Sequence, residues 1–260
     1  ARRIPGKEEF HGLVDWYEGQ VAEAGIDLRL GTRADAAGLR DFDEVILATG
    51  VLPRDPQIPG QDGPNVASYV EILTGAKTAG NRVAIVGAGG IGFDVAEYLV
   101  EDGAGVTEDL DAWLAEWGVT DPETSRGGLA PEGPKPAPAE RKVTLCQRKE
   151  GRPGKGLGKT TGWIHRASLR MKGVEMVGGV NYERIDAEGL HVSFGEDRER
   201  PTLIGADTIV LCAGQVPFRP LLDDLTAAGV RVHVIGGADI AAELDAKRAI
   251  DQGARLAAAL

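Results

Sequence analysis

Two hydrophobic periods alternate along the chain, and together they predict an α/β protein. Between residues 7 and 24 apolar side chains recur at every third or fourth position, from Phe10 to Val21, which predicts an amphipathic helix. Gly25 then supplies the left-handed residue that ends this helix. Short apolar runs bounded by turn residues predict strands, most of them buried on both faces. These strands are expected at 26–30, 43–50, 83–86, 143–146, 174–180, 190–194, 208–214 and 232–235.

Helical patterns separate several of these strands, as in a parallel sheet with crossover helices. They are expected at 70–73, 91–100, 110–117, 162–172 and from 239 to about 260. The stretch 101–140 interrupts the alternation as a long insertion, with one short helix that ends at Gly118 and a proline- and glycine-rich remainder. We assign it no chemical role.

A glycine-rich turn joins the strand at 83–86 to the helix that begins near Ile91. Gly87, Gly89 and Gly92 have the spacing G-x-G-x-x-G, in which the glycines allow a tight turn, close approach of a pyrophosphate and close packing of helix on strand. The helix N-terminus adds free N–H groups and a partial positive charge. The motif predicts a dinucleotide site, the alternative being a turn that only packs. Its candidate residues are Gly87, Ala88, Gly89, Gly90, Ile91 and Gly92.

The end of the strand at 143–146 indicates which dinucleotide binds. A carboxylate there would accept hydrogen bonds from the ribose hydroxyls of NAD, but Arg148 and Lys149 follow instead. Two cations suit the 2′-phosphate of NADP, so we favour NADP(H) over NAD; the alternative is a solvated loop. The glycine-rich stretch 153–160 adds Lys159 as a third candidate phosphate ligand. It is not a P-loop, because Pro153 stands where the first glycine is required.

Small residues end two further strands and mark possible cofactor contacts. Ala48, Thr49 and Gly50 end the strand at 43–50, and Ala213 and Gly214 end the strand at 208–214. A cofactor could lie against such backbone, although a plain strand end would look the same.

Asp239 stands at the predicted start of the last helix, after the glycine turn 236–237. There it would be the N-cap residue. The same carboxylate could accept a hydrogen bond from a ribityl or ribose hydroxyl of a flavin.

Composition and charge narrow the possible functions. The net charge of −11 over 260 residues argues against nucleic acid as a partner, yet 141–172 contains ten basic residues and only one acidic residue. Such a basic island suits a small anionic ligand. No apolar run is long enough for a membrane helix, and we expect no membrane partner. Cys146 and Cys212 form no C-x-x-C motif, which favours a cytoplasmic protein with buried thiols. The histidines lack metal-ligand spacing, so no metal site is predicted.

Six stretches, taken together, resemble one protein family. They are IPGKEEF (4–10), DFDEVILATG (41–50), VAIVGAGGIGFD (83–94), GLGKTTGWIHR (156–166), LCAGQVPFR (211–219) and IGGADIAAELDAKRAI (235–250). The chain resembles the C-terminal portion of bacterial NADPH-dependent 2,4-dienoyl-CoA reductases of fatty acid β-oxidation, in the trimethylamine-dehydrogenase-like flavoprotein group. In that family NADPH reduces FAD, and electrons pass through an iron–sulfur cluster to FMN in an N-terminal TIM-barrel domain. Hydride transfer needs no side-chain acid or base, so we name no catalytic residue.

The resemblance also implies a domain organisation. Two cysteines cannot supply an iron–sulfur cluster, and the first glycine fingerprint of an FAD domain is missing, so we expect a fragment without the barrel. It implies a Rossmann-like NADP-binding domain (81–215) inserted in a truncated FAD-binding module of the glutathione-reductase type (1–80 and 216–260). The partner would be the TIM-barrel domain of the parent enzyme. The alternative is a non-catalytic adenine-nucleotide-binding or electron-transfer module of an amine-dehydrogenase-like flavoprotein.

Overall fold

The chain divides into two compact units, each composed of two segments. Unit 1 contains Ala1–Gly19 and Pro56–Ala213, and unit 2 contains Gln20–Asp55 and Gly214–Leu260. The computed structural model describes residues 3–101, 105–242 and 246–260, so part of the predicted insertion 101–140 lies outside the described residues. The assignment of the units to an NADP-binding domain and an FAD-binding module stays a prediction.

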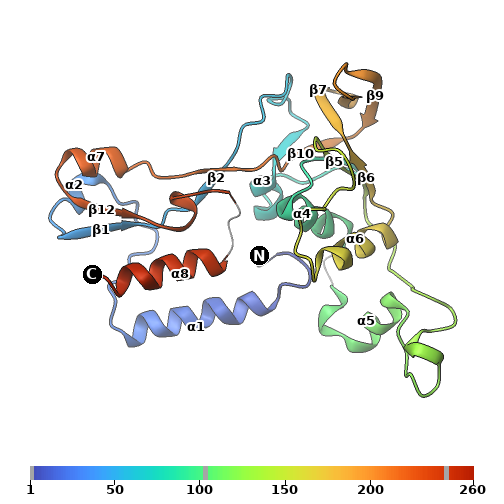
Figure 1. Ribbon diagram of the computed structural model, residues 1–260, viewed down its shortest axis with the longest axis horizontal. Helices are drawn as coiled ribbons and strands as arrows, with labels where there is room; N and C mark the ends of the chain where they lie inside the picture. The colour runs from blue at the N-terminus through green and yellow to red at the C-terminus, as the bar shows by residue number, and fades with distance from the viewer. Residues whose placement is uncertain (1–2, 102–104, 243–245) are drawn as a thin grey trace. The chain divides into compact units, whose positions relative to one another are not determined.

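A five-stranded parallel sheet forms the centre of unit 1, with the strand order β3-β10-β4-β5-β6 (Figure 1). All four pairings between neighbouring strands are parallel. The strands are β3 (Val66–Ser68), β4 (Arg82–Val86), β5 (Lys142–Gln147), β6 (Glu175–Gly178) and β10 (Thr208–Leu211). This sheet confirms the predicted α/β class with a Rossmann-like parallel core.

Both faces of this sheet are covered, which explains why its central strand is apolar at consecutive positions. Val83 and Ile85 of β4 pack in one cluster with residues of α3, α4 and α6. Ala84 and Val86 pack on the opposite side, against an antiparallel sheet. The helices are α3 (Tyr69–Thr74), α4 (Gly90–Val100) and α6 (Gly162–Met171), close to their predicted bounds.

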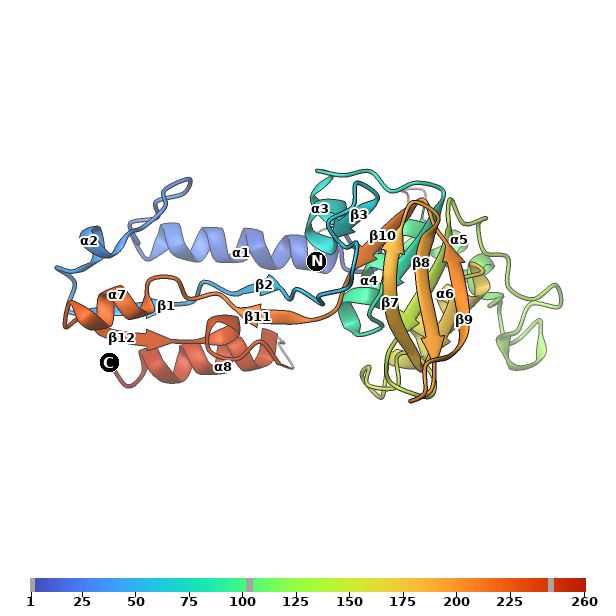
Figure 2. The same ribbon diagram turned by 90° about the horizontal axis from the view of Figure 1, so that it is seen from above.

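The antiparallel sheet consists of β7 (Val180–Asp186), β8 (Gly189–Phe194) and β9 (Glu199–Gly205), which lie side by side in Figure 2. The sequence predicts one strand over 174–180, but the structure divides this stretch between β6 and β7. The division occurs at Gly179, whose φ is +74° and whose N–H donates to the Lys149 carbonyl. A residue at positive φ cannot continue a strand, so the chain turns there into the second sheet.

The described part of the insertion contains η1 (Val106–Glu108), α5 (Leu110–Trp117) and η2 (Arg126–Gly128). Helix α5 and its end at Gly118 confirm the prediction, since Gly118 has φ +64° and its N–H closes the last turn. The helix is fixed to the rest of unit 1 by Glu116, which is buried 3.6 Å from the ammonium group of Lys172.

Unit 2 contains two small sheets and a separate apolar cluster. Its strands are β1 (Glu44–Leu47) parallel to β12 (Arg231–Val234), and β2 (Val51–Pro53) antiparallel to β11 (Gln215–Pro217). Its helices are α2 (Ala36–Leu39), α7 (Leu222–Ala227) and α8 (Ala246–Ala257), with the turn η3 (Gly236–Ala238). Val45, Leu47 and Leu225 form the core. Helix α1 (Glu9–Glu23) begins in unit 1 and ends in unit 2, and it confirms the first predicted helix.

The predicted strand at 26–30 is wrong. These residues form irregular backbone, and Ile26, Leu28 and Leu30 are 57%, 55% and 79% exposed. The apolar alternation is present, but no described strand pairs with this segment. A strand needs a neighbour for its backbone hydrogen bonds, so alternation alone does not form one.

Candidate dinucleotide-binding site

The G-x-G-x-x-G turn connects β4 to α4, as the sequence predicts, and the structure gives each glycine a different role. Gly87 has φ +112°, and a Cβ placed on it would lie 2.3 Å from the carbonyl oxygen of Cys212. A Cβ on Gly92 would lie 1.9 Å from the carbonyl oxygen of Gly87. At Gly89 and Gly90, by contrast, a Cβ would have nothing within 4 Å. This bend, residues 87–92, therefore packs closely against protein backbone at Gly87 and Gly92. At Gly89 and Gly90 it is open.

The N-terminus of α4 has free hydrogen-bond donors. Gly89 is the N-cap residue, and no side chain caps the helix there. The first helical amide with a backbone acceptor is that of Phe93, which donates to Gly89. Within the described residues, the amides of Gly90, Ile91 and Gly92 have no protein acceptor. Three free N–H groups at a helix N-terminus can bind phosphate oxygens.

The carboxyl end of β5 lies beside the bend. Gly87 donates its backbone N–H to the Cys146 carbonyl at 2.9 Å. Beyond it, Arg148 and Lys149 are exposed, and neither side chain forms an ion pair with a described residue. The Lys149 carbonyl accepts from the Gly179 N–H at 3.0 Å and from the Gln147 side chain at 2.9 Å, which fixes the backbone of the segment. Two cations are thus held on a fixed backbone next to the bend.

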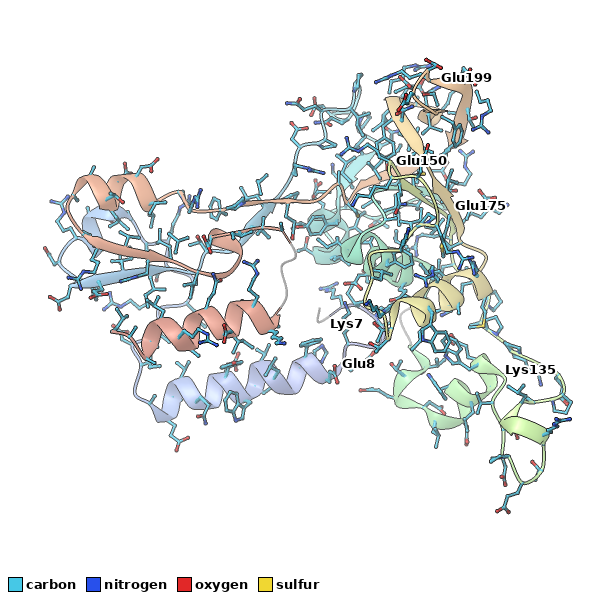
Figure 3. The ribbon with its side chains drawn as sticks, in the orientation of Figure 1. Lys7, Glu8, Lys135, Glu150, Glu175 and Glu199 are labelled. Atoms are coloured by element: carbon cyan, nitrogen blue, oxygen red, sulfur yellow. The ribbon has the colours of Figure 1, made fainter. Side chains whose placement is uncertain are left out.

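Lys159 lies on a loop that packs against the first turns of α4. At Gly154 a Cβ would lie 2.5 Å from the ring of Phe93, and the Gly154 carbonyl accepts from the Arg166 guanidinium at 2.8 Å. Lys155 and Lys159 are exposed on this loop. Glu150, the one acidic residue of the basic island, is labelled in Figure 3 and is exposed as well.

Two acidic residues of α4 form contacts that sequence reasoning missed. Asp94 pairs with Lys7 at 2.6 Å, and Glu97 lies 2.7 Å from the imidazole of His165 on α6 (Lys7 is labelled in Figure 3). The hydrogen bond with Glu97 raises the pKa of His165 above its ordinary value, against the opposing effect of burial. The two acids connect α4 to the chain before α1 and to α6.

The small-residue strand ends lie together in unit 2, with the exception of Ala213, which belongs to unit 1. The Thr49 hydroxyl donates to the Phe218 carbonyl, and the Phe218 N–H donates to the Gly50 carbonyl at 3.0 Å. The Gly214 carbonyl accepts from the Arg54 N–H at 2.9 Å. Residues 48–50 and 214–218 are thereby brought side by side at the pair β2 and β11.

The N-cap role predicted for Asp239 is wrong. Asp239 follows the turn η3, and the described part of the last helix begins only at Ala246. Its carboxylate instead accepts from the side chain of Gln252 on α8 at 2.9 Å, and Gln252 also accepts from the Gly236 N–H. Asp239 therefore holds α8 against the glycine turn. Its suggested contact with a flavin stays a prediction.

Both cysteines are free and buried, as the sequence predicts for small apolar residues. Burial raises the pKa of the Cys146 thiol to about 12, and it raises that of Cys212 as well. Neither thiol ionises near neutral pH, so neither is a nucleophile.

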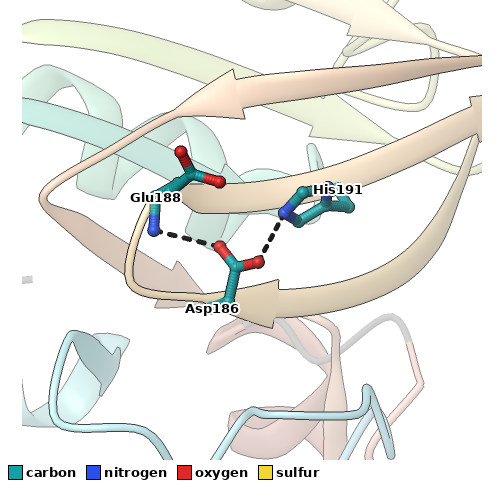
Figure 4. Close-up of side chains that lie close together, drawn as sticks. All are labelled: Asp186, Glu188 and His191. Carbon is teal, nitrogen blue, oxygen red and sulfur yellow. Dashed lines mark hydrogen bonds and ion pairs between the residues drawn. The ribbon is translucent and has the colours of Figure 1, made fainter.

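Among the described residues, one group of side chains has atoms close enough to hold a cation: Asp186, Glu188 and His191, on the hairpin between β7 and β8 (Figure 4). The Asp186 carboxylate already contacts the Arg184 guanidinium, and it lies 2.7 Å from His191. Partial burial would raise the pKa of Asp186, but the backbone N–H of Glu188 and the side chains of Arg184 and His191 lower it to about 2. Arg184 therefore neutralises this carboxylate without a metal.

Among the described residues no helix combines the length and the apolar character that crossing a membrane requires.

Residues 39–247 match the model of the pyridine nucleotide-disulphide oxidoreductase family. A metal reductase of Desulforamulus reducens is 26% identical over 244 residues, which are 92% of this chain and 35% of the relative. A cinnamate reductase of Clostridium sporogenes is 37% identical over 111 residues, which are 40% of this chain and 16% of the relative.

The fold has counterparts among solved structures. A 2-naphthoyl-CoA reductase in complex with 2-naphthoyl-CoA matches 97% of this chain with a TM-score of 0.75 and 20% identity, and the match covers 32% of that protein. The chain therefore spans about a third of the length of the metal reductase and of this structure.

Proposed function

Because the chain belongs to the pyridine nucleotide-disulphide oxidoreductase family, we propose that it is the pyridine-nucleotide-binding part of a flavin-dependent oxidoreductase. In this proposal NADPH is the hydride donor and FAD the acceptor. Family membership supports binding of FAD and NAD(P). The observation that carries the choice of site is the bend at 87–92, where glycines leave the surface open in front of unpaired helix N–H groups.

The residues of the bend would bind the pyrophosphate. The amides of Gly90, Ile91 and Gly92 would donate to its oxygens, and the α4 dipole would add a favourable field. Gly89 permits this approach because its missing side chain leaves the space in front of the helix empty. Both contributions are common to NADPH and NADH.

Arg148 and Lys149 would discriminate between the two coenzymes. Both side chains are free to pair with a 2′-phosphate, and Lys159 on the adjacent loop would add positive charge. The two residues that directly follow β5 are both cations, Arg148 and Lys149, and the first carboxylate after the strand is that of Glu150. Three cations of the basic island, Arg148, Lys149 and Lys159, would thus be explained by the additional phosphate of NADPH.

FAD, when bound, accepts a hydride from NADPH and passes its electrons onward. We propose the small-residue strand ends and Asp239 as its contacts: Ala48, Thr49, Gly50, Ala213, Gly214 and Asp239. The protein would orient the two cofactors and exclude water, and this transfer needs no side-chain acid or base. We assign no catalytic residue.

The proposal for the parent enzyme is an unsaturated acyl-CoA reductase of the 2,4-dienoyl-CoA type. It rests on the six family-like stretches, and the cinnamate reductase among the relatives is named for another unsaturated acid. A TIM-barrel domain with FMN and an iron–sulfur cluster would complete such an enzyme, in the cytoplasm. The chain alone, mixed with NADPH and a 2,4-dienoyl-CoA, should therefore bind NADPH without forming reduced product.

Replacing Arg148 tests the coenzyme assignment. We expect Arg148→Ala to raise the Kd for NADPH about ten-fold, because a charge-assisted contact to phosphate is lost, while the Kd for NADH stays within about two-fold. Titration calorimetry on the 260-residue chain measures both constants. Arg170→Ala, which removes an exposed arginine of α6, is the matched control and should change neither value.

Equal losses for NADPH and NADH in Arg148→Ala would contradict the 2′-phosphate assignment. ADP distinguishes the alternative function. If ADP binds as tightly as NADPH, and NADPH does not reduce added FAD, the chain is an adenine-nucleotide-binding module rather than a reductase domain.

A further inference from the structure

The carbonyl oxygen of Cys146 connects the bend at 87–92 to the basic segment, residues 148–149, which follows β5. It accepts two hydrogen bonds, one from the Gly87 N–H at 2.9 Å and one from the Tyr182 hydroxyl at 3.0 Å. Cys146 is fully buried in β5 and stands two residues before Arg148. The orientation of this one peptide group therefore affects both the start of the glycine turn and the direction in which the chain leaves β5.

Tyr182 reaches the Cys146 carbonyl from another layer of the fold. It lies on β7, in the antiparallel sheet, and its ring packs in the apolar cluster that contains Val86 and Cys146. Burial raises the pKa of the Tyr182 phenol, so the hydroxyl remains a hydrogen-bond donor at all ordinary pH values. Tyr182 itself pairs with Val192 of β8, just before a register shift between Tyr182 and Arg184.

The hydroxyl and the ring of Tyr182 have separable effects. The ring fills space in the cluster, and a phenylalanine would fill it equally well. The hydroxyl donates the second hydrogen bond to the Cys146 carbonyl, whose first comes from Gly87, and the phenol oxygen also interacts with the Gly87 backbone N–H. Removing the hydroxyl leaves the Cys146 carbonyl with one donor, so this buried oxygen still has a hydrogen bond.

We propose that Tyr182 is a positioning residue for coenzyme selection: its hydroxyl fixes the distance between the pyrophosphate bend at Gly87 and the cations at Arg148 and Lys149. The inference rests on the proposed function of that site. NADPH must contact both places at once, whereas NADH uses only the bend. If the Cys146 carbonyl is held less firmly, the binding of NADPH weakens more than the binding of NADH.

The test is Tyr182→Phe, with the Kd for NADPH and for NADH measured side by side on the full chain. We expect the Kd for NADPH to rise about five-fold, the size of one lost hydrogen bond, and the Kd for NADH to change less than about two-fold. A purely structural role would leave the ratio of the two constants as it is in the wild type. Tyr98→Phe is the matched control, because Tyr98 lies on α4 and its hydroxyl has no hydrogen bond to a described residue.

Three results separate the inference from the function on which it rests. A wild-type chain that binds no NADPH overturns the proposed function and the inference together. A wild type that prefers NADPH, with a Tyr182→Phe variant of unchanged ratio, overturns the inference alone. Equal weakening of both coenzymes also overturns it, because the hydroxyl would then support only the bend.

Hydrogen exchange tests the role of the Tyr182 hydroxyl without a ligand. In Tyr182→Phe the Gly87 amide should exchange several-fold faster, while the Ile85 amide in the middle of β4 keeps its wild-type rate. Unchanged protection at Gly87 would show that the hydroxyl does not hold the Cys146 carbonyl. Should the phenylalanine variant fold poorly, Tyr182→Leu, which keeps a large apolar side chain without any hydrogen-bond donor, provides the same comparison.

Discussion

At Gly87, Gly89 and Gly92 the side chain is absent for different physical reasons. Gly87 adopts φ +112° and lies against the Cys212 carbonyl, and Gly92 lies against the Gly87 carbonyl. A methyl group at either position would collide with backbone, which cannot move as a flexible side chain can. At Gly89 a methyl group would meet only open space. Gly87 and Gly92 are required by the fold, and Gly89 leaves room for a ligand.

Alanine at these positions should therefore separate folding from binding. Gly92→Ala places its Cβ 1.9 Å from the Gly87 carbonyl oxygen, and we expect the free energy of unfolding to fall by about 2 kcal/mol or more. Gly89→Ala should leave that free energy within about 0.5 kcal/mol of the wild type, while NADPH affinity falls about ten-fold. Denaturant unfolding and calorimetric titration measure the two effects. If Gly89→Ala keeps full NADPH affinity, the pyrophosphate does not bind at the bend.

The pair of His165 and Glu97 predicts a pH dependence of stability. The hydrogen bond to Glu97 raises the folded-state pKa of His165 above its unfolded value. The protonated imidazole therefore stabilises the fold fully below pH 6.5, and this contribution is lost as the pH rises through the folded-state pKa. Unfolding of wild type and His165→Gln should differ most near about pH 6 and least near about pH 9. A constant difference across this range would show that the pair is not linked to protonation.

At the scale of elements, helix α5 is joined to the nucleotide-binding unit by buried charges. The Lys172 ammonium group, at the end of α6, contacts the Glu101 carboxylate and lies 3.6 Å from that of Glu116. Lys172 is 2% exposed at its side chain, and Oε2 of Glu116 has no hydrogen-bond partner among the described residues. The site holds two carboxylates and one ammonium group, so it depends on Lys172.

Lys172→Met should leave two buried carboxylates without a cation. We expect the free energy of unfolding to fall by about 3 kcal/mol, the range found when one partner of a buried pair is removed. Adding Glu116→Gln to this variant should recover part of the loss. Lys142→Met, at an exposed position of β5, is the control and should change little. A Lys172→Met variant as stable as the control would show that α5 is held by its apolar contacts instead.

The central elements could be predicted because their local patterns agree with the whole fold. The run at 83–86, the glycines that follow and the strand at 143–146 need only their own residues to be recognised. Strand β9 was missed because it begins with two charged residues and a proline, and its apolar run is only Leu203 and Ile204. The segment 26–30 was mistaken for a strand because apolar alternation says nothing about whether a neighbouring strand exists.

Some residues of the candidate site could likewise be predicted from the sequence, and others could not. The glycine motif and the cations after β5 can be recognised in the sequence, because both are defined by their positions relative to a predicted strand. Tyr182 has no such signal, since its contact with Cys146 depends on the packing of two sheets. The N-cap prediction for Asp239 failed because a short turn, η3, lies between the strand and the last helix, and glycines 236–237 suit either arrangement.

At the scale of the whole molecule, the proposed NADPH site lies within a single unit. The bend, the basic segment and the loop with Lys159 all belong to unit 1, as do all strands of both sheets that pack around β4. Between 56 and 213 the chain is continuous. The part of unit 1 outside this stretch, Ala1–Gly19, contributes the buried side chain of Ile4, a hydrogen bond from the Thr107 hydroxyl to Glu8, and the partly exposed ion pair of Lys7 with Asp94.

Residues 56–213, expressed alone, should therefore fold cooperatively and bind NADPH. Loss of the Lys7 pair and of the buried Ile4 should cost about 3 kcal/mol of unfolding free energy, which is below the stability of an ordinary domain. The Kd for NADPH should stay within about three-fold of the full chain, because every proposed NADPH ligand is retained. Circular dichroism during denaturation and calorimetric titration measure both. A fragment that folds but does not bind NADPH would show that residues outside 56–213 contribute to this site, and the bend at 87–92 would then be only part of it.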